Sequence, residues 1–102
     1  MSSLDAKKPE NTATIRLAGR FDFNSFKNFQ NQYEPLLADP AIAVIDINMS
    51  GVSYLDSSAL GMLMLLREKA DAAGKRVRIE QSQGMARDIL DMANFHKRFE
   101  FI

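Results

Sequence analysis

The chain has 102 residues, of which 46% are hydrophobic, so it is long enough to form one domain around a single core. Thirteen basic residues balance thirteen acidic ones, which leaves no global field to attract nucleic acid or anionic lipid. The sequence contains no cysteine, which excludes disulfides, thiolate metal sites and cysteine nucleophiles and favours a cytoplasmic protein.

The N-terminal residues 1–10 are polar and lack the apolar core of a signal peptide. We therefore expect a flexible lead-in over these residues and a single domain over residues 11–102. The richest apolar runs, at residues 41–45 and 60–66, are far shorter than the approximately 18 residues that mark a membrane span. We expect no segment that crosses a bilayer.

The first regular element is predicted at residues 12–17, where apolar and polar residues alternate as in a half-buried strand. Gly19 is expected to end this strand. The apolar spacing then becomes helical from about Ser25, which is a candidate N-cap together with the residue before it. Pro35 and Pro40 are expected to limit the length of this helix.

Residues 41–47 form a short, β-branched apolar run interrupted only by Asp46, a pattern typical of a central strand covered on both faces. A turn is predicted at residues 49–51. A second, longer helix is expected to begin at residues 56–57 and to end before Gly74, which supplies the stop signal.

The last predicted elements are a half-buried strand over residues 76–80 and a helix whose apolar face consists of Met85, Ile89, Met92 and Ala93. The resulting order is strand, helix, strand, helix, strand, helix. This alternation predicts an α/β domain with a mixed or parallel sheet, because a parallel crossover needs a helix between strands.

Three consecutive residues with capping side chains, Asp56, Ser57 and Ser58, stand where the longer helix begins, which is more than one N-cap needs. In the structural interpretation, Asp56 or Ser57 caps the helix and the other serine is tolerated in the first turn. A helix N-terminus also favours a phosphate, which either serine could carry beside Asp56. The local pattern alone favours the structural interpretation, because helix caps greatly outnumber regulatory sites.

Residues 45–61, IDINMSGVSYLDSSALG, strongly resemble the core of STAS domains, the anti-sigma factor antagonists. Gly19-Arg20-Phe21-Asp22 is similar to the Gly-Glu-Leu-Asp turn of that family, and the resemblance covers nearly the whole chain. It implies a STAS-type α/β domain with a small mixed sheet of four to five strands and helices packed mainly on one face.

The resemblance also implies a function. The unphosphorylated domain would bind a serine kinase that is itself an anti-sigma factor, the kinase would reverse this by phosphorylating the domain, and a serine phosphatase would reset it. By position, Ser57 is the phosphoacceptor, Asp22 and Asp56 lie on the docking surface, and Ser58 supports Ser57.

Two residues depart from the family pattern. Arg20 stands where the family usually has glutamate, and Ala59 stands where many members have glycine. Arg20 reverses a charge next to Asp22 and therefore predicts a partner whose complementary surface differs. Ala59 favours the helix by up to about 1 kcal/mol over glycine.

A helical wheel of the longer helix places one group of residues on a common face, namely Ala59, Met62, Leu63, Leu66 and Ala70. Gly61, Met64 and Leu65 fall outside that face. They form either a partner-binding patch next to Ser57 or part of a broadly buried helix.

Two other functions remain open from the sequence. The chain could be a structural STAS subunit of a lipid-transport ATPase complex, or an enzyme with Ser57 as nucleophile. The enzyme hypothesis is weak, because His96 is the only histidine that could act as a base and it lies far from Ser57 in the sequence. His96 also has no neighbouring residue that would complete a metal site. We expect no metal and no cofactor, since the chain has no nucleotide-binding P-loop and the nucleotide would belong to the kinase. The sequence carries no signal for an oligomeric state.

Overall fold

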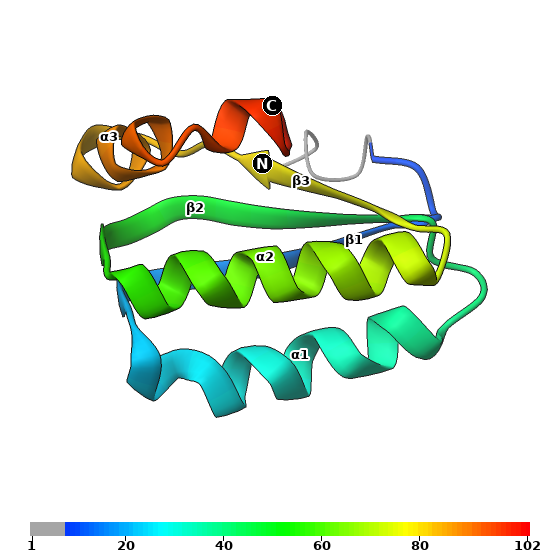
Figure 1. Ribbon diagram of the computed structural model, residues 1–102. Helices are drawn as coiled ribbons and strands as arrows, with labels where there is room; N and C mark the ends of the chain where they lie inside the picture. The colour runs from blue at the N-terminus through cyan, green and yellow to red at the C-terminus, as the bar shows by residue number, and fades with distance from the viewer. Residues whose placement is uncertain (1–7) are drawn as a thin grey trace, which may run out of the picture.

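In the computed structural model of the protein, which describes residues 8–102, strands and helices alternate along the chain (Figure 1). The elements in chain order are β1 (Thr12–Phe21), the 3-10 helix η2 (Phe23–Ser25), α1 (Phe26–Ala38), β2 (Val44–Leu55), α2 (Ser57–Ala72), β3 (Arg76–Glu80), α3 (Gly84–Met92), the 3-10 helix η3 (Phe95–Lys97) and β4 (Glu100–Phe101). The predicted alternation is confirmed. Of the lead-in expected over residues 1–10, residues 1–7 lie outside the described residues.

Within residues 8–102 the strands form one four-stranded sheet in the order β1-β2-β3-β4, and every neighbouring pair is parallel. The predicted α/β class is confirmed, and the sheet is parallel throughout the described residues rather than mixed. Because parallel strands all point the same way, the segments that follow β1, β2 and β3 leave the sheet at one edge.

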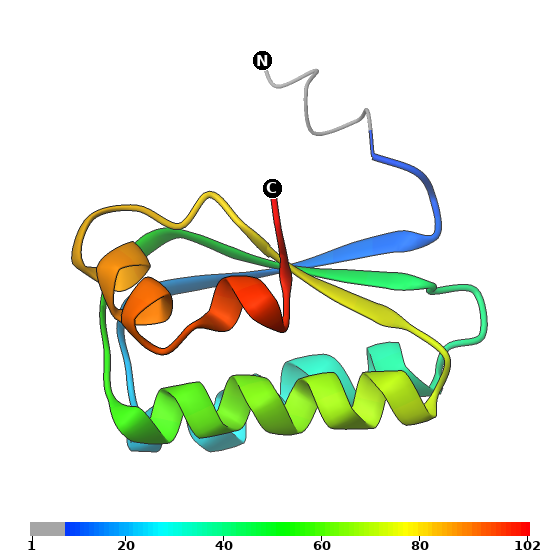
Figure 2. The same cartoon turned by 45° about the horizontal axis from the view of Figure 1, so that its top comes forward.

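Helices α1 and α2 lie side by side on one face of the sheet, as Figures 1 and 2 show. The residues that α2 buries are the five that the helical wheel places on its core face, namely Ala59, Met62, Leu63, Leu66 and Ala70. From α1, Phe29 and Tyr33 enter the same core, where Phe29 packs edge-on against both Phe21 and Tyr33 with ring centroids 5.1 Å apart. Helix α3 packs against β2.

Both long strands extend further than predicted. Strand β1 passes through Gly19, which has a φ of 70°, and the register with β2 shifts on either side of that residue. A glycine adopts this conformation without steric cost, so the strand bends instead of ending. Strand β2 likewise continues through the turn predicted at residues 49–51, because Gly51 remains paired with Ala18 of β1.

Helix α1 also differs from the prediction, since it contains Pro35 and ends at Ala38. Proline deprives the carbonyl of Asn31 of its helical partner, but Asn31 is exposed and water can replace that hydrogen bond. Ser25 occupies the N-cap position of α1 without a side-chain hydrogen bond.

The apolar face predicted for the last helix is wrong at Met85 and Met92, whereas Ile89 and Ala93 do pack against the core. Helix α3 buries Ala86 and Leu90, whereas Met85 and Met92 are exposed. Ala86 and Leu90 lie on the face of the helix that is turned to the core, so the two methionines lie on its solvent side. Ile89 lies between the two groups and is half-buried against the core.

The sheet carries charged residues near its centre. Asp46 of β2 is fully buried and accepts hydrogen bonds from Arg78 Nε at 2.7 Å and Arg78 Nη2 at 2.9 Å. Lys8 Nζ lies 3.0 Å from Asp46 Oδ2 and 2.9 Å from Glu80 Oε2. Burial alone would raise the pKa of Asp46, but the hydrogen bonds and charges of Arg78 and Lys8 lower it below its ordinary value. The single acidic residue in the apolar run is therefore neutralised by two cations.

Among the described residues, no helix combines the length and apolar character that a bilayer span requires.

Candidate functional site

Two aspartates follow the paired ends of β1 and β2. The last residues of these strands pair in register, so Asp22 and Asp56, which follow them, occupy neighbouring positions. Asp22 Oδ1 accepts a hydrogen bond from the backbone N–H of Asn24 at 3.0 Å, and Asp56 Oδ1 accepts one from the N–H of Ala59 at 2.8 Å. Each carboxylate thus caps the helical segment that follows it, η2 or α2.

Ser57 is the first residue of α2 and is exposed. Because Asp56 provides the cap, the Ser57 hydroxyl is not needed for that role, and it makes no hydrogen bond within residues 8–102. Ser58, the next residue, is half-buried. An accessible hydroxyl at the positive end of a 16-residue helix can accept a phosphoryl group and favours the resulting negative charge.

Arg20 adds a cation to this edge of the sheet. It pairs in register with Tyr54 of β2, and its guanidinium carbon lies 4.5 Å from the centroid of the Tyr54 ring. Its Nε lies 3.8 Å from Asp22 Oδ2, and the Arg20 side chain is 66% exposed. An exposed contact of this length contributes little stability, so Arg20 is held mainly by the aromatic ring.

An apolar groove of about 340 Å³ has Ser58, the residue after Ser57, in its lining. Its lining residues come from η2, α1 and α2 and are Phe23, Phe26, Ser58, Gly61, Met62 and Leu65. Phe23 is 71% exposed and Leu65 is 37% exposed, so apolar side chains on both sides of the groove face solvent. Exposed apolar surface of this kind is typical of a site for another protein.

The lining of the groove shows where the residues outside the core face of α2 lie. The structure brings Ser58, Gly61 and Leu65 together in its lining, whereas Met64 is half-buried and packs against the core. Phe23 is absent from the predicted site because an aromatic residue in a short segment looks like a core residue. The available signal was its position directly after Asp22, a capping residue that turns the chain outward.

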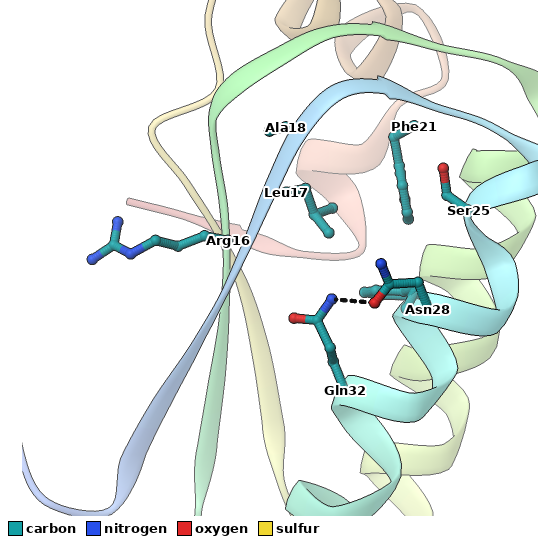
Figure 3. A pocket seen from close by; sticks show the side chains of 8 residues that line it. Arg16, Leu17, Ala18, Phe21, Ser25, Asn28 and Gln32 are labelled. Carbon is teal, nitrogen blue, oxygen red and sulfur yellow. Dashed lines mark hydrogen bonds between the residues drawn. The ribbon is translucent and has the colours of Figure 1, made fainter.

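A second hollow, of about 260 Å³, lies between the outer edge of β1 and α1 (Figure 3). Leu17 and Phe21 point into it from β1, Arg16 points away, and Gln32 donates a hydrogen bond to Asn28 at its rim. It contains none of the predicted site residues.

His96 lies in η3 and is exposed, and no hydrogen bond joins it to Ser57 within the described part of the chain. Residues 8–102 also contain no cluster of three or more histidine or acidic side chains that could hold a metal ion. The described residues at this edge of the sheet thus combine an exposed hydroxyl, two capping carboxylates and a nearby apolar groove.

The chain is similar to known proteins by sequence. A protein-family model described as "Mlab, STAS domain" matches residues 4–102. A STAS-domain containing protein from Pseudomonas aeruginosa (strain UCBPP-PA14) is 38% identical over 87 residues, which are 85% of this chain and 84% of that protein.

Solved structures share the fold at lower identity. The anti-sigma factor antagonist SpoIIAA in its unphosphorylated form has a TM-score of 0.71 and 19% identity, over 93% of this chain and 82% of SpoIIAA. The phosphorylated form of SpoIIAA from Bacillus has a TM-score of 0.69 and 18% identity, over 92% of this chain and 85% of SpoIIAA. The STAS domain of a SulP transporter from Vibrio cholerae has a TM-score of 0.71 and 16% identity, over 94% of this chain and 77% of that domain's chain.

Proposed function

The protein belongs to the STAS domain family, and on that basis we propose that it is an anti-sigma factor antagonist whose binding is controlled by phosphorylation of Ser57. The unphosphorylated protein binds an anti-sigma factor that is also a serine kinase, phosphorylation of Ser57 ends this binding, and a serine phosphatase restores it. In this proposal the protein acts in the cytoplasm, together with these partners. The protein is thus a binding module and a kinase substrate.

The observation that carries this proposal is the position of Ser57. It is exposed at the start of α2, it is relieved of the capping role by Asp56, and Ser58 beside it belongs to the apolar groove. In this proposal, a partner that packs into the groove extends over the neighbouring Ser57 and covers its hydroxyl. Asp22 and Asp56 lie at the same edge and orient the partner through their charges. Gly61 and Leu65 contribute contact surface, and Met64 supports it from behind.

Phosphorylation changes this surface through solvation and charge. The kinase transfers the γ-phosphoryl group of its own ATP to Ser57 Oγ, the hydroxyl loses its proton, and ADP leaves. The product carries almost two negative charges and three acceptor oxygens at the rim of an apolar groove. A partner that covered the phosphate would have to desolvate these charges beside two carboxylates, which costs several kcal/mol.

The direct experiment is to incubate the chain with its partner serine kinase and ATP and to map the modified residue by mass spectrometry. We expect phosphate on Ser57, its loss in Ser57→Ala, and its retention in the matched control Ser58→Ala. Phosphate on Ser58, or an unmodified chain beside an active kinase, would contradict the proposal.

A second candidate is a structural STAS subunit of a lipid-transport ATPase complex. The same fold occurs in the STAS domain of a SulP transporter. Because this fold is found in a transporter, the second candidate is retained. In that case the groove would be a permanent interface with the ATPase, and phosphate on Ser57 would not control it. Affinity capture with the tagged chain distinguishes the two candidates, because recovery of a transporter ATPase instead of a serine kinase favours the second.

A further inference from the structure

Arg20 is the one charged residue at the site to which the proposed function gives no role. Its side chain is 66% exposed and lies at the end of β1, stacked on Tyr54 and 3.8 Å from Asp22. This contact with Asp22 is longer than a hydrogen bond and exposed to solvent. The Arg20 guanidinium is therefore held at this edge of the sheet mainly by the Tyr54 ring and interacts only weakly with the Asp22 carboxylate.

The sheet register brings Arg20 towards Ser57. Arg20 pairs with Tyr54, and the residues after the next pair are Asp22 and Asp56. Neighbouring strands lie about 4.8 Å apart, so Asp56 and Ser57 start α2 directly beside the carboxylate that Arg20 contacts. The guanidinium and the Ser57 hydroxyl thus belong to one small region at the carboxyl edge of the sheet.

The chemistry of this region calls for a cation once Ser57 is phosphorylated. Asp22 and Asp56 repel a phosphate placed near them, while a guanidinium binds phosphate through two parallel N–H···O bonds. A doubly charged phosphate is a stronger ligand for arginine than a distant, solvated carboxylate. Rotation of the Arg20 side chain exchanges the weak contact with Asp22 for a charge-assisted pair.

We propose that Arg20 binds the phosphate group on Ser57 and in doing so leaves Asp22. Phosphorylation then changes the docking surface in two ways, because it adds the phosphate and also frees the Asp22 carboxylate from its cation. Arg20 is a positioning residue for the modified state. This inference rests on the proposed phosphorylation of Ser57, but its test does not need the kinase.

The test uses chains in which phosphoserine is placed at position 57 by genetic encoding, in the native background and with Arg20→Met. Pairing with arginine favours the doubly charged phosphate and lowers its second pKa, which ³¹P NMR measures during a pH titration. We expect Arg20→Met to raise this pKa by at least about 0.5 unit, roughly a threefold change in proton affinity. The control Arg98→Met removes the same charge from an exposed position before β4 and should leave the second pKa of the phosphate unchanged. Equal pKa values in the native and Arg20→Met backgrounds would overturn the inference.

A second measurement needs no substitution. The Arg20 Nε–H resonance should shift when phosphoserine replaces Ser57 and return when a phosphatase removes the phosphate. An Arg20 signal that is identical in both forms would also overturn the inference. A chain that the kinase leaves unmodified, but whose encoded phosphoserine contacts Arg20, would refute the proposed function while supporting this contact.

Discussion

Asp56 belongs both to the fold, as a helix cap, and to the proposed docking surface. Its carboxylate accepts the N–H of Ala59 at 2.8 Å, so it stabilises the start of α2. The same side chain is only half-buried and presents a negative charge next to Ser57. The first role needs an acceptor oxygen, whereas the second needs the charge, so substitutions can separate them.

We expect Asp56→Ala to lower the free energy of unfolding by about 1 kcal/mol, because the N–H of Ala59 loses its partner. Asp56→Asn keeps an acceptor oxygen and should retain most of that stability while it weakens partner binding. Urea denaturation measures the first effect and titration calorimetry with the partner measures the second. Equal destabilisation by both substitutions would show that the charge, not the cap, stabilises α2.

At the scale of elements, α2 presents two faces with different roles. Leu63 is fully buried against the sheet, whereas Leu65, two residues later, lies on the groove side and is 37% exposed. The first side chain contributes to folding, and the second belongs to the proposed docking surface. The two leucines therefore offer a matched pair for experiment.

Leu63→Ala should lower the free energy of unfolding by about 2–5 kcal/mol, since it leaves a cavity in the core. Leu65→Ser should change stability by less than about 1 kcal/mol, because surface substitutions away from the core have small effects. Leu65→Ser should nevertheless weaken partner binding at least tenfold. If Leu65→Ser had native stability and bound the partner as tightly as the native chain, the groove would not be part of the docking surface.

The sequence predicts α2 well because its apolar residues follow one strong helical period and its cap and stop residues stand at both ends. It fails for α3, where Met85 and Ala86 compete for the core face and the outcome depends on how closely that helix can approach the sheet. It also misses Phe23, since the exposure of an aromatic residue is decided by how η2 packs and not by local spacing. The capping triplet draws attention to residues 56–58, whereas the prediction that Ser57 is the phosphoacceptor depends on the family resemblance.

At the scale of the whole molecule, charge inside the sheet makes stability depend on pH. Asp46 is fully buried and bound by Arg78 and Lys8, and these cations keep its pKa below the ordinary value of 3.8. The unfolded chain therefore binds a proton at Asp46 before the folded chain does. The stability that this group contributes is complete above pH 3.8 and is lost as the pH falls through the lower folded pKa.

We expect Asp46→Asn to cost roughly 3 kcal/mol at pH 7, the lower end of the range for a broken buried pair, because Arg78 and Lys8 retain some access to solvent. Its stability should also fall less steeply than that of the native chain as the pH drops below 4. Asp88→Asn, the same change at an exposed position of α3, should follow the native curve. Urea denaturation across this pH range provides the comparison, and parallel curves for Asp46→Asn and the native chain would refute the linkage.

The central claim, that phosphorylation of Ser57 ends partner binding, is tested most directly by the dissociation constant of the partner serine kinase. Titration calorimetry should compare the native chain, Ser57→Ala, Ser57→Asp and the chain with encoded phosphoserine at position 57. We expect the native chain and Ser57→Ala to bind alike, and the two charged forms to bind at least tenfold more weakly, a difference of about 1.4 kcal/mol or more. Equal affinity of the phosphorylated and unphosphorylated chains would contradict the claim.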